Sequence, residues 1–104
     1  MPYKIFFTKS GRNTYNNCID YILKKFKDPF TANSLNTDIE AIIAFLETNP
    51  YSCPLCDNPK LSNRNIRKIH LRKHKYKIFY HILDNKVIID AVTHDSQDFE
   101  KALW

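Results

Sequence analysis

Residues 76–93, which read YKIFYHILDNKVIIDAVT, decide the fold of this chain. The segments 76–83 and 86–93 alternate between apolar and polar residues or run apolar, and both are rich in β-branched and aromatic side chains. These features are typical of β-strands. Asp84 and Asn85 lie between the two segments and tolerate positive φ, so they predict a tight hairpin turn. We therefore expect two antiparallel strands that are neighbours in one sheet.

The residues before this hairpin predict one more strand on each side of a helical pair. Residues 3–8 and 66–71 have the composition of short strands. Between them, apolar residues at three- and four-residue steps predict a helix over 10–27, capped by Ser10, and a second helix that ends near residue 48. Asp28-Pro29 separates the two helices, which should pack as an antiparallel hairpin. A last helical turn is expected within residues 96–104.

This order of elements predicts an α+β fold made of one domain over residues 1–104. An N-terminal strand and a helical hairpin precede an antiparallel β-meander, and the helices cover one face of the sheet. No long apolar segment is present, since the longest apolar run is residues 41–46, so we expect no membrane association. Three cysteines without an export signal favour free thiols and a cytoplasmic location.

The positive charge of the chain is concentrated between residues 60 and 77. The net charge is +5 and the pI is near 9.2, and this stretch holds eight of the 16 Lys and Arg residues and no acidic residue. Clustered cations are suited to a polyanion because they displace its counterions on binding. A nucleic acid is the partner that this pattern favours, although an acidic protein segment would be attracted as well.

Strand alternation assigns these cations to a face. Tyr76, Ile78, Tyr80 and Ile82 form the more apolar set and should face the helices, as should Val87, Ile89 and Ala91 in the last strand. The opposite parity carries cations next to imidazoles, a combination suited to phosphodiester chemistry. The residues expected on this open face are Lys68, His70, Arg72, Lys77, His81 and His94, with Phe79 and Val92 also pointing outward.

A zinc finger is an alternative reading of the same region. Cys53, Cys56, His70 and His74 have a spacing close to that of C2H2 fingers, which bind nucleic acids. A finger would make residues 60–74 helical, whereas the meander needs residues 66–71 to be extended. The two readings exclude each other, and the core residues that a finger needs are displaced, so we favour the meander.

The chain resembles the RelE/ParE superfamily of toxins from type II toxin–antitoxin modules. The resemblance is carried by residues 65–69 (NIRKI), 76–82 (YKIFYHI) and 84–89 (DNKVII), followed by His94 and Asp98. It implies that an antitoxin neutralises the chain by laying an acidic helix or extended segment over the basic sheet face.

Members related to RelE cut mRNA, usually on the ribosome, and need no metal or other cofactor. By strand register, the resemblance implies catalytic roles for Lys68, His70 and Lys77, and an acid or base role for His94. The other residues expected to contact RNA are Arg64, Arg72, Lys73, Lys75 and His81. Gln97 stands where RelE has an arginine, and the ending is also similar to that of ParE, whose members inhibit DNA gyrase and cut nothing. An mRNA endoribonuclease is favoured, and gyrase inhibition is the alternative.

Overall fold

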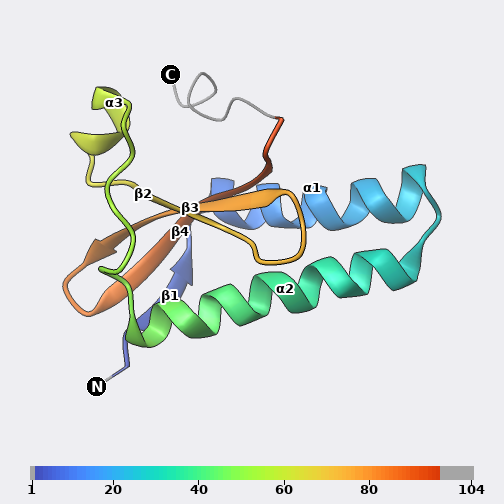
Figure 1. Cartoon of the computed structure of the whole chain (residues 1–104), viewed down its shortest axis with the longest axis horizontal. Coiled ribbons are helices and arrows are strands. Elements are labelled where there is room, and N and C mark those ends of the chain that lie inside the picture. Colours follow the sequence, from blue (N-terminus) through green and yellow to red (C-terminus); the bar gives the residue numbers. More distant parts are fainter. Residues whose placement is uncertain (1, 97–104) are drawn as a thin grey trace.

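The computed structural model describes residues 2–96 and has an α+β architecture (Figure 1). The elements follow the expected order, with one short addition between the second helix and the meander. They are β1 Lys4–Phe7, α1 Lys9–Lys25, α2 Pro29–Thr48, α3 Pro59–Ser62, β2 Arg67–His70, β3 Tyr76–Leu83 and β4 Lys86–His94. Within the described residues, no helix has the length and apolarity needed to cross a bilayer.

The four strands form one mixed sheet in the order β1-β4-β3-β2. The two hairpins β2–β3 and β3–β4 are antiparallel, as expected for the meander. The N-terminal strand β1 adds to the meander at one edge and pairs with β4 in parallel, which makes the sheet mixed. Parallel pairing needs a long crossover connection between the two strands, and the helices α1 and α2 lie in the connection between β1 and the other strands.

Thr8, rather than Ser10, caps helix α1. The Thr8 side chain accepts a hydrogen bond from the Gly11 amide at 2.9 Å, which satisfies one of the free donors of the first turn. The helix ends at Lys25, two residues earlier than expected, and Lys27 has a positive φ of 49°. Helix α2 begins at Pro29, so the boundary at Asp28-Pro29 is as predicted. The Asp28 carboxylate caps the helix by accepting from the Thr31 amide at 3.0 Å.

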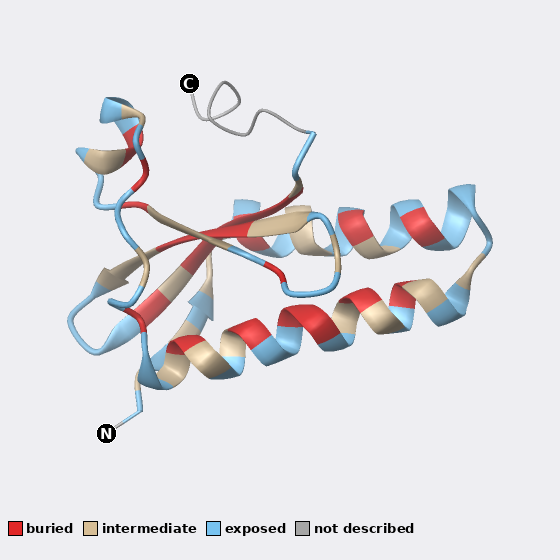
Figure 2. Cartoon of the chain, viewed as in Figure 1, coloured by how far each residue is buried: buried red, intermediate tan, exposed pale blue. Residues whose placement is uncertain are grey.

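The main core lies between the helical hairpin and the inner face of the sheet, the face that α1 and α2 cover (Figure 2). Ile78, Tyr80, Val87 and Ile89 are fully buried there, as their parity predicts. Helix α2 contributes its whole apolar stripe, including Leu35, Ile39, Ile42 and Leu46. The apolar residues at the far end of the hairpin remain exposed instead, with Phe26 at 61% and Phe30 at 85%, because no strand reaches them.

A second, smaller core covers part of the opposite, outer face of the sheet. Phe79 was expected to face solvent, but it is fully buried among side chains from the loop before β2. Leu61 of α3 is also fully buried in this cluster, together with Cys56, Ile66 and Ala91. The segment between α2 and β2 therefore closes over the middle of the outer face.

A β-bulge in β4 changes the parity that simple alternation predicts. Tyr80 pairs with Ile89 and Phe79 pairs with Ala91, so Asp90 is an extra residue in β4. Beyond the bulge, Ala91 joins the outer cluster and Val92 joins the main core, opposite to the assignments made from sequence. His94 changes face for the same reason.

Candidate functional site

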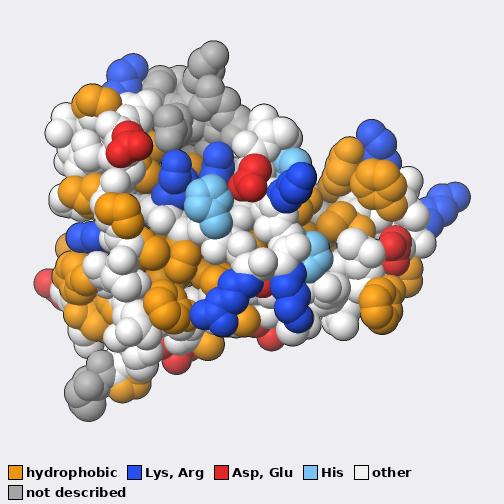
Figure 3. Space-filling model, in the orientation of Figure 1, with side chains coloured by type: hydrophobic (Ala, Val, Ile, Leu, Met, Phe, Trp, Pro, Cys, Tyr) orange, Lys and Arg blue, Asp and Glu red, His pale blue; other side chains and the backbone are white. Residues whose placement is uncertain are grey.

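Three of the predicted catalytic side chains share the outer face of the β2–β3 pair. Lys68 pairs with Phe79, and His70 pairs directly with Lys77. Side chains of directly opposed residues stand on the same face, about 5 Å apart at Cα. We call Lys68, His70 and Lys77 the basic face. The space-filling view shows Lys, Arg and His side chains gathered in the middle of the molecule (Figure 3).

His70 supplies the imidazole of the basic face and is exposed to solvent. Its side chain is 61% exposed, and its Nδ1 lies 3.5 Å from Asp95 Oδ1. Lys77 is half-buried, and its Nζ lies 5.8 Å from the centre of the Phe79 ring. On its other side Lys77 pairs with Thr93 of β4, which is buried. The basic face thus combines an accessible acid or base with two half-buried lysines.

His94 does not join the basic face. It pairs with Tyr76, the residue before Lys77 in β3, on the inner face of the sheet, and the two rings meet edge to face at 5.0 Å between centroids. Its Nδ1 accepts a hydrogen bond from the Ser96 amide at 3.0 Å. The prediction that His94 completes the outer cluster is wrong, because the bulge at Asp90 turns it toward the helical side.

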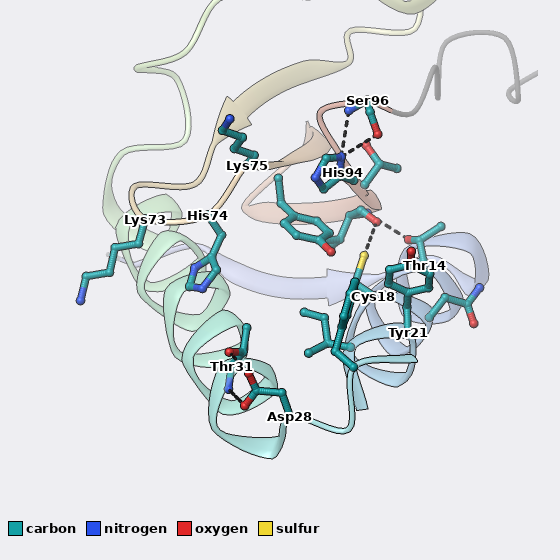
Figure 4. A pocket seen from close by; sticks show the side chains of 16 residues that line it. Thr14, Cys18, Tyr21, Asp28, Thr31, Lys73, His74, Lys75, His94 and Ser96 are labelled. Atoms are coloured by element: carbon teal, nitrogen blue, oxygen red, sulfur yellow. Dashed lines mark hydrogen bonds between the residues drawn. The ribbon is translucent and has the colours of Figure 1, made fainter. Parts of the chain in front are cut away.

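On that side, His94 lines a groove of about 1140 Å³ between the helical hairpin and the end of the sheet (Figure 4). Apolar groups from α1 form one wall, including Cys18 and Tyr21, and Lys73, His74 and Lys75 stand at the opposite side. Burial raises the pKa of the Cys18 thiol to about 11.

Arg72, Lys73 and Lys75, expected to contact RNA, lie exposed on the connection between β2 and β3. One buried carboxylate holds this connection. Asp38 of α2 accepts from the backbone amides of Lys73 and His74, both at 3.0 Å, and lies 2.9 Å from His74 Nδ1. Burial by itself would raise the pKa of Asp38, but these hydrogen bonds outweigh it and hold the pKa below its usual value.

The four residues of the zinc-finger reading do not converge. His70 lies in an extended strand on the outer face, whereas His74 contacts Asp38 and lies 3.4 Å from Ser34 Oγ of α2. Cys56 is buried in the outer core, and of the residues 60–74 that a finger would make helical only 60–62 are so. Within residues 2–96, no group of three or more His, Cys, Asp or Glu side chains is arranged to hold a metal ion. The finger reading is therefore wrong.

His81 and Arg64, also expected to contact RNA, stand at the other end of the outer face. His81 Nδ1 lies 2.7 Å from Asp90 Oδ2, and the positive charge of Arg64 reaches the same carboxylate. Burial is the main influence on Asp90 and leaves its pKa raised, although His81 and Arg64 act in the opposite direction. Gln97 and Asp98 lie outside the described residues, as does nearly all of the segment expected to form a last helical turn.

Two carboxylates that contact the imidazoles of His74 and His81 were not among the residues predicted from sequence. Asp38 interrupts the apolar stripe of α2, and Asp90 interrupts the apolar run of β4. A charged residue at a buried position usually has a partner, so the pattern did contain a signal. Which partner each one has depends on the register of strands far away in the sequence.

Comparison with solved structures supports the fold. The chain is similar to a structure described as the chromosomal ParDE TA system from P. aeruginosa, with a TM-score of 0.71, 12% identity, and coverage of 88% of this chain and 95% of that chain. It is also similar to a mutant of the E. coli toxin RelE in the free state (TM-score 0.66, 15% identity, coverage of 98% and 93%). A third similar structure is the RelBE2 toxin–antitoxin complex from Mycobacterium tuberculosis (TM-score 0.61, 18% identity, coverage of 90% and 99%).

No curated protein matches the sequence. The family model described as ParE toxin of type II toxin–antitoxin system, parDE, matches residues 5–99. The match runs from the second residue of β1 to beyond the end of β4, and so covers the elements that the described residues form, apart from Lys4. The chain therefore belongs to the ParE toxin family of type II toxin–antitoxin systems.

Proposed function

We propose that this toxin arrests growth as an endoribonuclease that cuts mRNA, in the cytoplasm and on the ribosome. The observation that carries this proposal is the basic face, where an exposed imidazole stands between two lysines on paired strands. Such a cluster can bind a phosphodiester and also move a proton, which a purely electrostatic surface cannot do.

The reaction that fits these groups is attack by a ribose 2′-oxygen on the adjacent phosphate. His70 accepts the 2′-hydroxyl proton or donates a proton to the leaving 5′-oxygen, and Asp95 beside its Nδ1 favours one orientation of the ring. Lys68 and Lys77 stabilise the charge that develops on the phosphate oxygens. His94 has no part in this mechanism, because it lies on the other side of the sheet.

Induced expression followed by mapping of transcript ends tests this proposal. Wild-type protein should produce cut mRNA, and His70→Ala or Lys77→Ala should reduce cleavage by about 10²–10⁴-fold, the usual contribution of an acid–base group. Lys24→Ala, which removes a cation from the exposed side of α1, is the matched control and should cut normally. Cleavage that survives both site variants would contradict the assignment.

Gyrase inhibition is a second candidate, and the match to the ParE family model favours it. On this reading, the basic face and the exposed end of the helical hairpin would contact a protein and no RNA would be cut. Intact transcripts together with a DNA-damage response in arrested cells would select this candidate over the nuclease.

We further propose that the partner is a cognate antitoxin that covers the basic face with an acidic segment. Similar solved structures include the RelBE2 and the E. coli RelBE toxin–antitoxin complexes. Coexpression with the small reading frame adjacent to the gene should relieve growth arrest. Replacing the acidic residues of that partner should restore the arrest, and a partner that protects equally well without them would contradict the electrostatic model.

A further inference from the structure

A second polar cluster lies on the outer face, separate from the basic face. His81 of β3 and Asp90 of β4 are joined by a 2.7 Å contact between Nδ1 and Oδ2. The buried Phe79 and Leu61 lie between this pair and Lys77, since Phe79 is the intervening outward residue of β3. His81 and Lys77 are four residues apart, roughly 13 Å along an extended strand, so a single phosphate cannot touch both.

The β-bulge in β4 positions this pair on the outer face. Asp90 is the extra residue of the bulge, which places it and Ala91 toward the outer face. On the inner face, the first turn of α1 presses against the bulge. The Thr8 amide donates to the Ile89 carbonyl at 3.0 Å, and a Cβ on Gly11 would lie 2.1 Å from that oxygen. The only glycine of the chain therefore stands where the helix meets the bulge.

The contact with Asp90 determines what His81 can do. The Asp90 side chain is 11% exposed and, as a carboxylate, can only accept, so Nδ1 of His81 carries the proton. The other ring nitrogen, Nε2, then becomes an acceptor in the neutral ring. The imidazole is 27% exposed, which leaves it accessible to a ligand. A fixed acceptor of this kind suits a hydroxyl group, and RNA presents one at every ribose.

Arg64 supplies the cation that such a ligand needs. It is exposed in the turn that follows α3, where its amide donates to the Leu61 carbonyl at 3.0 Å. Leu61 packs in the outer cluster with Phe79 and Ala91, the residues next to the His81–Asp90 pair on the outer face. A guanidinium can donate to phosphate oxygens in a fork geometry. An acceptor for the 2′-hydroxyl and a donor for the adjacent phosphate thus border the same outer cluster.

We propose that His81, oriented by Asp90 and accompanied by Arg64, forms a second RNA subsite that binds a ribose 2′-hydroxyl and its neighbouring phosphate. This inference rests on the proposed ribonuclease function, because it extends the same RNA strand from the basic face past α3. Its role is to select RNA over DNA and to hold the strand in register. His81, Asp90 and Arg64 touch no reacting atom, so they are positioning residues.

The test compares the binding of one labelled RNA decamer and the DNA of the same sequence by fluorescence anisotropy. Chemically synthesised and refolded protein is measured at 4 °C, and a gel checks that the RNA stays intact. We expect His81→Ala to weaken RNA binding about tenfold, the loss of roughly one well-formed hydrogen bond, and to change DNA binding less than about twofold. Asp90→Asn should show a smaller loss in the same direction, because the imidazole is no longer held in one tautomer.

Arg64→Ala should weaken RNA and DNA alike and reduce the salt slope of log K by roughly one, as expected for one lost phosphate contact. Lys24→Ala is again the matched charge control. Circular dichroism verifies that each variant folds. If His81→Ala does not fold, His81→Gln replaces it, and we expect that variant to lose RNA preference as well.

The outcomes separate this inference from the proposed function. If induced cells contain cut transcripts but the RNA-to-DNA preference is the same in folded His81 and Asp90 variants, the subsite is refuted and the nuclease stands. If the wild-type protein neither binds the RNA decamer nor cuts transcripts, the proposed function is refuted, and the subsite with it.

Discussion

Asp38 offers the sharpest test of how this fold holds its basic surface. We consider Asp38→Ala, which deletes the carboxylate under the β2–β3 connection while leaving α2 with a strong helix former. The Asp38 side chain is 3% exposed and accepts two backbone hydrogen bonds at 3.0 Å and one from His74 at 2.9 Å. Hydrogen bonds to charged groups contribute about 1.5–3 kcal/mol each, and they are not additive.

Deleting the acceptor of these three contacts leaves their donors without a partner, and we expect a combined loss of about 3–5 kcal/mol. A domain of this size has a total stability of about 5–15 kcal/mol, so the variant should remain folded but with a much lower midpoint. Urea denaturation followed by circular dichroism at pH 7 measures the difference. Asp20→Ala, an exposed carboxylate of α1, is the matched control and should change stability by less than about 0.5 kcal/mol.

The same carboxylate predicts a dependence on pH. Its pKa in the folded state lies below its unfolded value, so its contribution is present above the unfolded pKa and is lost as pH falls through the folded pKa. The stability difference between wild type and Asp38→Asn should therefore shrink below about pH 4, near the ordinary pKa of aspartate. Two results would refute this reasoning. One is a decrease in unfolding free energy of less than about 1 kcal/mol in Asp38→Ala. The other is a difference in stability between wild type and Asp38→Asn that stays constant down to pH 3.

Three other predictions concern the cores and the bulge. Gly11→Ala should destabilise the chain by at least about 2 kcal/mol in thermal or urea denaturation, because the added Cβ would lie 2.1 Å from the Ile89 carbonyl oxygen; a variant as stable as wild type would show that α1 can shift freely. Tyr80→Phe removes a buried hydroxyl that donates to the Pro50 carbonyl at 2.7 Å, and the expected cost is about 1–3 kcal/mol, since the carbonyl loses a partner. Cys18 should react with a thiol reagent at pH 8 far more slowly than Cys53, because Cys18 is buried and its pKa is raised to about 11, whereas Cys53 is partly exposed; equal rates in the folded protein would be the contrary result.

The order and type of the elements could be predicted from local patterns. The hairpin at residues 84–85, the break at Asp28-Pro29 and the three-residue and four-residue spacing in α1 and α2 each depend on neighbours within a few positions. The basic face was predictable to the same extent, because Lys68, His70 and Lys77 lie in regular strand segments where alternation holds. A resemblance spread over most of the chain indicated the family that the match to residues 5–99 shows.

The errors in the assignment of strand faces arise where a distant contact overrides local alternation. The bulge at Asp90 moves Ala91, Val92 and His94 to the faces opposite to those expected. At this point Thr8, 81 residues earlier, donates to the Ile89 carbonyl, and Gly11 lies so close that an added Cβ would be 2.1 Å from the same oxygen. Phe79 is buried for a similar reason, since Leu61 packs in the same cluster from a short helix with too few residues for a periodic signal.

The sequence by itself determined the fold class, the element order and the concentration of cations in and around strands β2 and β3, because these follow from side-chain period and charge within short windows. Only the tertiary structure decided which imidazoles accompany those cations. It separated His94 from His70, and it paired His81 with Asp90 and His74 with Asp38. Each of these partnerships joins different strands, or a helix and a loop, and one extra residue in a strand reverses the faces of all the residues that follow.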